Sequence, residues 1–259
     1  MSGAGTAGRG ASRSARLPGS AKSSRGSRWS RWIKGIKWIF LGLILLLLLV
    51  QLYFFLQICW WSRFNPSMTS FMSAQLSVMR ATRPNAALEH KWVPYGAISA
   101  NLKRAVIASE DANFAEHDGV DWVALEKAYA RNTTRHKVVG GGSTITQQLA
   151  KNLFLSGSRS YLRKGQEMII AFMLETVMSK QRILEIYLNV VEFGRGVFGA
   201  EAAARHYFRV PAASLSAAQA ARLAVMLPNP RFYDRHRDSG YLARRTGLIV
   251  NRMNSAELP

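Results

Sequence analysis

Cysteine is almost absent from this chain, since Cys59 is the single one among 259 residues. A disulfide within the chain is therefore excluded, and cysteine content says nothing about the redox state of the compartment. Acidic residues are also scarce, with 15 Asp and Glu against 35 Lys and Arg, and the first of them is Glu89. The resulting net charge of +20 favours an anionic partner, whether nucleic acid, a phosphate-bearing ligand or a membrane.

The lack of acid is most marked at the N-terminus. Residues 1–37 carry nine basic side chains, and the first 35 residues are otherwise rich in Ser, Gly and Ala. Such a segment has little to bury, so we predict a disordered basic tail over residues 1–35. The tail serves solubility, contact with anionic lipid head groups, or both.

Charge is missing altogether between Trp38 and Ile58, where the sequence runs WIFLGLILLLLLVQLYFFLQI. Its 21 residues extend about 30 Å as a helix, which is the thickness of a bilayer core. Tryptophan residues flank both ends, as in interfacial aromatic belts. We predict one transmembrane helix at residues 36–60, with a cytoplasmic N-terminus because the basic residues precede it.

A juxtamembrane segment follows at residues 61–90. Its apolar side chains recur at the spacing of one helix face, namely Phe64, Met68, Phe71, Met72, Leu76 and Met79. We expect an amphipathic helix over residues 64–79. Its apolar face packs either on the main domain or on the outer leaflet of the membrane.

The remaining residues, 91–259, are predicted to be mainly helical. Helix starts are indicated by Ser99, Asp121, Thr144 and Ser216, the last two as capping boxes with Gln147 and Gln219. A long helical region runs from Tyr161 to Val191, with a break near Ser179. No alternating strand pairs are evident, so the fold class is mainly all-α.

The segment GRGVFG at residues 194–199 matches the dinucleotide-binding fingerprint letter for letter. That fingerprint requires a preceding strand and an acidic residue about 20 positions later. Here a helical stretch precedes the segment, and Gln219 stands where the acidic residue would be required. We therefore interpret the segment as a turn that ends one helix and opens the next.

Three glycines at 140–142 lead into the polar stretch STITQQ and then Lys151. A glycine-rich backbone at a helix start exposes N–H groups at the positive end of the helix dipole. Ser143, Gln147 and Gln148 add neutral hydrogen-bonding groups. The segment suits an anion such as a phosphate, although a simple surface loop fits equally well, and the Gly-Lys-Ser/Thr order of a P-loop is missing.

Two further segments gather carboxylates in this basic domain. SEDANFAEHDG, at residues 109–119, contains Glu110, Asp111, His117 and Asp118. Glu110 is a candidate general base or acid, while the alternative is a solvated helix end in which His117 makes a structural hydrogen bond. The spacing matches no strong metal-ligand pattern.

The second segment, RSYLRKGQE, places Arg163 and Lys164 within one helical turn of Glu167. The same helix face continues into Ile170 and Leu174, so Glu167 lies where a polar face meets a buried one. Surface ion pairs are the alternative. A half-buried carboxylate beside cations is a candidate functional group.

Five segments in order resemble the motifs of one family, the peptidoglycan glycosyltransferases of family 51 in their monofunctional form. They are EDANFAEHDG, GGSTITQQLAKN, RKGQE, KQRILEIYLN and GRGVFGAEAAARHYF. The similarity covers most of residues 65–235, and no motif position departs from the pattern. It implies an α-helical, lysozyme-like catalytic domain, which we place at residues 91–259.

The resemblance also implies a reaction. The substrate is lipid II, and the growing glycan on its lipid diphosphate is transferred to the GlcNAc 4-hydroxyl of the next lipid II. Glu110 is then the base and Glu167 the second catalytic glutamate. The residues expected to face the donor diphosphate are Ser143, Gln147, Gln148, Lys151, Arg163 and Lys164. The resemblance leaves open a divalent cation such as Mg²⁺ near Glu167 and implies no other cofactor.

The expected location is the inner membrane of a bacterial cell, with the catalytic domain in the periplasm. The expected partners are lipid II, nascent glycan, the membrane, and proteins of cell-wall synthesis or division. The Ser-x-x-Lys and Lys-Thr-Gly motifs of transpeptidases are missing, so we expect polymerisation without cross-linking.

Two other function classes were weighed. A peptidoglycan hydrolase shares the lysozyme-like fold but needs no diphosphate site. A scaffold or nucleic-acid binder accounts for the positive charge but gives Glu110 and Glu167 no role. Because the densest basic run is the tail, without interleaved aromatic residues on one face, we expect no nucleic-acid partner.

Overall fold

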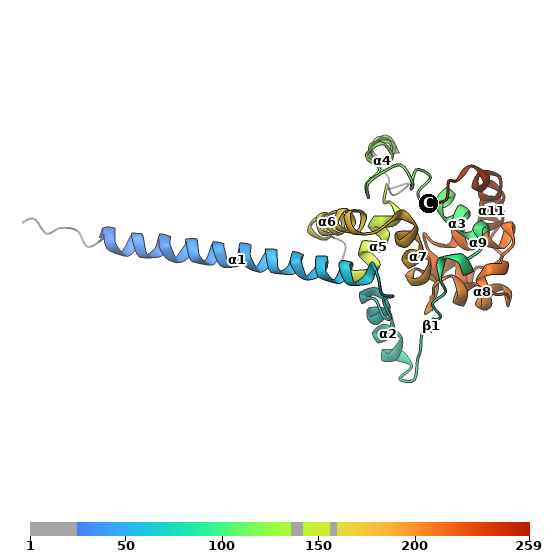
Figure 1. Cartoon of the computed structure of the whole chain (residues 1–259), viewed down its shortest axis with the longest axis horizontal. Helices are drawn as coiled ribbons and strands as arrows, with labels where there is room; N and C mark the ends of the chain where they lie inside the picture. The colour runs from blue at the N-terminus through green and yellow to red at the C-terminus, as the bar shows by residue number, and fades with distance from the viewer. Residues whose placement is uncertain (1–24, 136–141, 156–159) are drawn as a thin grey trace, which may run out of the picture. The chain divides into compact units, whose positions relative to one another are not determined.

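The computed structural model describes residues 25–135, 142–155 and 160–259 (Figure 1). The chain divides into two compact units, Met1–Val50 and Gln51–Pro259, and helix α1 (Arg25–Trp61) contributes residues to both. The first unit contains α1 up to Val50. The second contains every candidate site residue.

Helix α1 has the properties of a membrane anchor. Within the segment Trp32–Trp61, the most apolar window of 18 residues has a mean hydropathy of 2.8, and none of that window is buried in the protein. Its 30 residues extend about 45 Å, which exceeds the ~30 Å core of a bilayer. Among the described residues it is the one helix long and apolar enough to cross a membrane, and it contains the predicted span.

The helix begins earlier than the sequence suggested. It starts at Arg25, whereas we expected a disordered tail up to residue 35. Arg and Lys are good helix formers, so the helix continues outward from the apolar run into the basic segment. Residues 1–24 lie outside the described residues, and the disorder expected there stays a prediction.

The second unit is built mainly of helices, as predicted. They are α2 (Ser70–Thr82), α3 (Ala100–Glu110), α4 (Trp122–Arg135), α5 (Ile145–Phe154), α6 (Tyr161–Val177), α7 (Lys180–Val190), α8 (Ala200–Phe208), α9 (Ala217–Met226), α10 (Pro230–Arg235) and α11 (Gly240–Arg252). Short 3-10 turns lie at Tyr95–Ala97, Ala212–Ser214 and Met253–Ser255. The prediction of a mainly all-α fold is confirmed.

A small sheet was missed by the sequence analysis. Its strands are β1 (Glu89–His90), β2 (Glu192–Gly194) and β3 (Val197–Phe198), in the order β1-β3-β2. β1 runs parallel to β3, and β2 runs antiparallel to it. Strands of two or three residues are too short to show an alternating pattern.

The GRGVFG segment is part of this sheet as well as a turn. Gly196 and Gly199 have φ angles of +79° and +83°, a region that favours glycine. Gly196 lies in the turn between β2 and β3, and Gly199 is the N-cap of α8. The predicted opening of a helix is therefore correct, while the strands within the segment were overlooked.

Several helices begin at the polar residues that the sequence indicated. The side chains of Ser99 and Asp121 accept hydrogen bonds from the first turns of α3 and α4. Ser179 caps α7 and breaks the long helical region as predicted. Ser216 and Gln219 form the complete capping box expected at the start of α9.

The amphipathic helix expected after the membrane span starts later than predicted. Thr69 is the N-cap of α2, and Pro66 lies in the irregular connection before it. Proline lacks an amide hydrogen and its ring excludes it from a helix interior. Phe64 and Met68 therefore lie outside the helix and are exposed, whereas Met72 is buried against the domain.

The last turns of α1 are part of the second unit, which begins before the boundary at residue 61 that we expected. The ring centroids of Phe54 and Trp61 lie 5.0 and 5.2 Å from that of Phe154 on α5. The side-chain amides of Gln51 and Gln166 bond to each other at 2.8 and 2.9 Å. These turns are thus joined to α5 and α6, the helices that carry the candidate cations.

Candidate active site

One cavity of about 320 Å³ brings the candidate residues together. It is lined by Glu110, Ser143, Gln148, Lys151, Arg163, Lys164, Glu167, Leu227 and Pro228. Helices α3, α5 and α6 supply most of these side chains, and α5 packs directly on α6 and α7. Every predicted site residue except Gln147 lines the cavity, and Gln147 is buried in contact with Lys164.

Glu110 is the last residue of α3, and its carboxylate lines the cavity. Its Oε2 accepts a hydrogen bond of 2.9 Å from Gln148 Nε2. Burial in the surrounding protein raises the pKa of Glu110, and the Asp111 carboxylate adds to the increase, while the hydrogen bonds from Gln148 and Ser109 and the charge of Lys151 oppose it. A carboxylate with a raised pKa on a cavity has the properties of a general base.

Tyr187 is a site residue that the sequence analysis missed. Its buried hydroxyl donates a hydrogen bond of 2.9 Å to Gln148 Oε1, which leaves Nε2 of that amide directed at Glu110. Burial raises the pKa of Tyr187 well above its usual value, so the phenol remains a donor. The sequence held one indication of this role, namely a tyrosine among the aliphatic residues of KQRILEIYLN. A tyrosine buried with such residues requires a hydrogen-bond partner for its hydroxyl.

The neighbouring Asp111 has a structural role. Its Oδ2 accepts a hydrogen bond of 2.9 Å from the Ile145 amide, and its Oδ1 accepts one of 2.9 Å from His117 Nε2. The Gly119 amide donates to His117 Nδ1 at 3.2 Å, so a neutral His117 carries its proton on Nε2. These bonds join the end of α3 to the start of α5 and hold Glu110 in position. The structural hydrogen bond expected for His117 is present.

The start of α5 is closed to an anion, which corrects our interpretation of the glycine-rich segment. Thr144 Oγ1 accepts a hydrogen bond of 3.1 Å from the Gln147 amide, and the Asp111 carboxylate occupies the Ile145 amide. The Gln147 side chain binds Lys164 and does not complete the predicted capping box. Any anion in the cavity is therefore held by side chains more than by this helix start.

The described glycine of this segment has a packing role. A Cβ atom at Gly142 would come within 2.9 Å of the Cα atom of Leu125, so only glycine allows the chain to lie this close to α4. Gly140 and Gly141 lie outside the described residues. Gly142 is half-buried, and the exposed glycine backbone expected from the sequence stays a prediction.

Lys164 makes hydrogen bonds to several polar groups near the first turn of α6. Its ammonium donates to Ser143 Oγ and Gln147 Oε1 at 3.0 Å each, and to Glu167 Oε1 at 2.5 Å. Arg163 Nη1 donates to Glu167 Oε2 at 3.2 Å. Glu167 is only 4% exposed, so these are not the surface ion pairs that the sequence left open as an alternative.

Lys151 lines the cavity from α5, and within the described residues its ammonium has no hydrogen-bond partner. Burial lowers the pKa of Lys151; Glu167 and Glu110 counteract this effect, whereas Arg163 and Lys164 strengthen it. The buried Nε atom of Arg163 also has no partner among the residues that the structure describes. Cationic donors left free at a cavity are suited to an oxyanion such as a phosphate.

The residues do not form a ligand cage for a divalent cation. In the part of the chain that the structure describes, no group of three or more His, Cys, Asp or Glu is placed to hold a metal ion. Both carboxylate oxygens of Glu167 already accept hydrogen bonds from Arg163 and Lys164. The protein side chains near Glu167 therefore do not fit Mg²⁺.

The cavity continues into a second one of about 340 Å³. The two share the lining residues Gln148, Lys151, Leu227 and Pro228. The second part adds the ring of Phe71 from α2, Glu192 from β2 and Arg231 from α10. Together they form one cleft in which polar and charged groups lie beside an aromatic ring, as in sites for polar ligands.

Known proteins are similar to this chain over nearly the whole of its folded part. A family model described as Transglycosylase matches residues 77–254. A biosynthetic peptidoglycan transglycosylase of Janthinobacterium sp. (strain Marseille) is 69% identical over 222 residues, which cover 86% of this chain and 96% of the relative. The protein of the same name from Herminiimonas arsenicoxydans gives the same figures, and that of Bordetella avium (strain 197N) is 55% identical over 225 residues, covering 85% and 94%.

The helical fold and the cleft, with its glutamates and free cations, define a glycosyltransferase. The chain belongs to the Transglycosylase family, the peptidoglycan glycosyltransferases, and is an enzyme with the lysozyme-like all-α domain of that family. One N-terminal apolar helix accompanies the domain and indicates a membrane anchor.

Proposed function

We propose that this enzyme polymerises glycan chains from lipid II, a disaccharide-pentapeptide carried on a polyprenyl diphosphate. The donor is the growing glycan on its lipid diphosphate, and the acceptor is the GlcNAc 4-hydroxyl of the incoming lipid II. The observation that carries the proposal is the cleft itself, where Glu110 and the free ammonium of Lys151 line one cavity with Arg163. A proton acceptor and phosphate-binding cations within one cavity fit a reaction that releases a proton and a diphosphate.

In this reaction Glu110 takes the proton of the acceptor hydroxyl while the hydroxyl oxygen attacks C1 of the donor sugar. The bond between C1 and the diphosphate oxygen breaks, and its electron pair leaves with the diphosphate. The raised pKa of Glu110 makes its carboxylate a stronger base than an ordinary glutamate. Gln148 keeps the carboxylate oriented through its hydrogen bond to Oε2.

The leaving diphosphate gains negative charge, and Lys151 and Arg163 are the groups that balance it. Cations already in place stabilise such charge without the cost of reorganising solvent. Glu167 holds Arg163 and Lys164 next to each other and offsets their mutual repulsion. Ser143 and Gln147 act on the diphosphate indirectly, since both accept hydrogen bonds from the Lys164 ammonium.

The proposal includes a location in the inner membrane, with the N-terminus in the cytoplasm and the catalytic unit in the periplasm. Nine basic residues before the apolar helix and none acidic support this orientation. Reporter fusions placed after residue 70 test it. A reporter that works only in the cytoplasm contradicts the orientation.

We further propose that the enzyme elongates glycan without cross-linking it, because the sequence contains neither Ser-x-x-Lys nor Lys-Thr-Gly. Lipid II, nascent glycan and the membrane are its partners, and proteins of cell-wall synthesis or division are candidates.

Incubation of the purified full chain with labelled lipid II, followed by gel separation of the products, tests the activity. Chains that lengthen with time support the proposed polymerase. Cleavage of preformed glycan without any lengthening identifies a hydrolase and overturns the proposal.

A further inference from the structure

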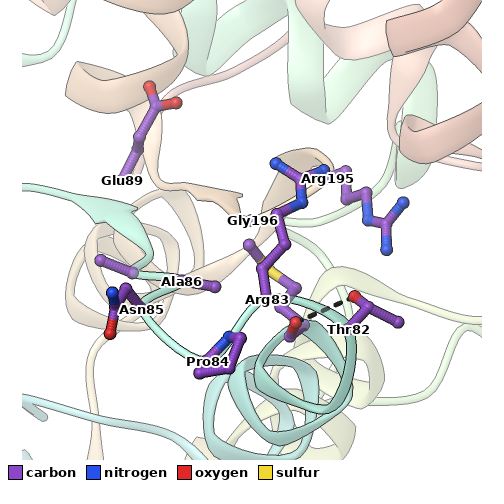
Figure 2. Close-up of a pocket in the computed structure, with 10 residues that line it drawn as sticks. Thr82, Arg83, Pro84, Asn85, Ala86, Glu89, Arg195 and Gly196 are labelled. Carbon is purple, nitrogen blue, oxygen red and sulfur yellow. Dashed lines mark hydrogen bonds between the residues drawn. The ribbon is translucent and has the colours of Figure 1, made fainter.

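A separate cavity of about 590 Å³ lies at the C-terminal end of α2, and none of its lining residues is one assigned to catalysis. Figure 2 shows the residues that line it. Its lining comes from the end of α2, the connection to β1, and the turn between β2 and β3. Met79 and Pro84 contribute apolar surface, and Asn85 contributes a side-chain amide. Gly196 allows close approach there, because a Cβ atom would lie 2.8 Å from Met79 Cε.

Two arginine side chains line this cavity without any partner. Within the described residues neither the guanidinium of Arg83 nor that of Arg195 makes a hydrogen bond or an ion pair, and both residues are exposed. Figure 2 shows them near each other in the view, with the carboxylate of Glu89 standing apart. Glu89 lines the cavity too, but its carboxylate pairs with His206 Nδ1 at 3.1 Å and makes no hydrogen bond or ion pair with either arginine in the described part of the chain.

Neighbouring arginines behave differently. The side chain of Arg80 binds the Ala86 carbonyl, that of Arg231 binds Glu192, and that of Arg237 binds Asp234. Two free guanidinium groups at one cavity are therefore a local exception. Guanidinium groups bind carboxylates with paired, directional hydrogen bonds, so the cavity is suited to a carboxylate on a partly apolar ligand.

The cavity lies along the same elements that wall the reaction cleft. Helix α2 contributes Phe71 to the cleft and Met79 to this cavity, and β2 with its turn contributes Glu192 to the cleft and Arg195 to the cavity. The eight-residue step from Phe71 to Met79 on α2 measures about 12 Å. An extended chain of five residues reaches about 17 Å.

We propose that this cavity binds carboxylate groups of the stem peptide of the substrate, through Arg83 and Arg195, while the sugars of the same molecule occupy the cleft. The inference rests on the proposed function, since it takes the disaccharide-pentapeptide of lipid II as the ligand. The peptide is long enough to pass along α2 from the cleft to the cavity. The apolar parts of the peptide contact Met79 and Pro84, and the two arginines bind its carboxylate groups.

The test compares two substrates on three proteins. The double variant Arg83→Glu/Arg195→Glu and the control Arg244→Glu are assayed beside the parent, with lipid II and with a lipid-linked disaccharide that lacks the peptide. Arg244 is a suitable control because it is exposed and makes no ion pair among the described residues. Circular dichroism confirms that the variants fold.

The expected result is a rise of about tenfold or more in the KM of the double variant for lipid II, since charge-assisted hydrogen bonds are lost. Its KM for the peptide-free substrate stays at the parental value, and the control variant is parental on both. An unchanged KM for lipid II, or an equal rise on both substrates, overturns the inference. Failure of the parent itself to polymerise either substrate instead overturns the proposed function on which the inference depends.

Discussion

The side-chain amide of Gln148 donates a hydrogen bond of 2.9 Å to the carboxylate of Glu110. The two residues come from α5 and α3 and lie 38 positions apart in the sequence. Tyr187, on α7, binds the other end of the same amide and so fixes which atom faces the carboxylate. Three helices thus set the orientation of the proposed base before any substrate arrives.

Replacement of Glu110 by Gln is expected to lower the rate of polymerisation at least ~100-fold, because a positioned general base contributes about 10² to 10⁴ in rate. Binding of lipid II should be largely kept, since the amide preserves shape and hydrogen bonding. The measurement is glycan synthesis by folded, purified variant. More than about a tenth of the parental rate contradicts the role of the base. The role would then pass to Glu167, which also lines the cavity, whereas Asp111 does not.

The pH–rate profile is expected to have two limbs. Protonation of Glu110 disables the base, and because its pKa is raised the rate falls at a higher pH than for an ordinary glutamate. The pKa of Lys151 is lowered, so its charge is lost at a lower pH than for an ordinary lysine. The variant Lys151→Arg keeps the charge at alkaline pH and should extend the alkaline limb upward. An alkaline limb that does not move in this variant assigns it to another group.

Replacement of Lys151 or Arg163 by Ala should lower the rate at which the donor reacts by about 10- to 150-fold. This is the effect of losing a charge-assisted hydrogen bond worth about 1.5–3 kcal/mol. The fold should remain intact, since Lys151 has no bonded partner among the described residues and Glu167 keeps its bond to Lys164 when Arg163 is replaced. Arg244→Ala, outside the cleft, is the matched control. Parental rates in both cleft variants would falsify the diphosphate assignment.

Tyr187→Phe tests whether the orientation of Gln148 matters. Removal of the hydroxyl leaves Gln148 Oε1 without its donor and frees the amide to turn away from Glu110. We expect kcat to fall with little change in KM, and the acidic limb of the pH profile to shift as the bond from Gln148 to the carboxylate is lost. A variant with unchanged kcat and pH profile shows that the hydroxyl serves only the core.

Asp111→Ala is expected to lower the free energy of unfolding by about 1–3 kcal/mol, because the buried Ile145 amide and His117 lose their acceptor. Chemical denaturation measures the change. The variant His117→Ala removes one of the two bonds and should cost less. If both variants are as stable as the parent while activity is lost, Asp111 has a catalytic role instead.

Sequence reasoning predicted the helix starts well, because a cap depends on residues close together in the chain. Ser99, Asp121, Ser179 and Ser216 all lie where the pattern placed them. It failed where a local pattern had competing partners. Gln147 was assigned to a capping box, yet Lys164 from another helix takes its side chain.

The residues of the cleft were identified from sequence, but the role of each residue was not. Glu110, Lys151, Arg163 and Glu167 were candidates because carboxylates and cations stand out in their motifs. Whether a carboxylate faces a cavity or caps a helix depends on which distant elements approach it. Only the fold separates Glu110, on the cleft, from Asp111, bound to the α5 amide.

The sequence by itself determined the apolar span, the helical class and the motifs, because each depends on composition or on spacing within a few turns. The tertiary structure alone decided that Tyr187 supports Gln148, that the start of α5 is closed, and that Arg83 and Arg195 share a cavity. Such pairings join residues tens of positions apart. They follow from the packing of whole helices, which leaves no signature in a short stretch of sequence.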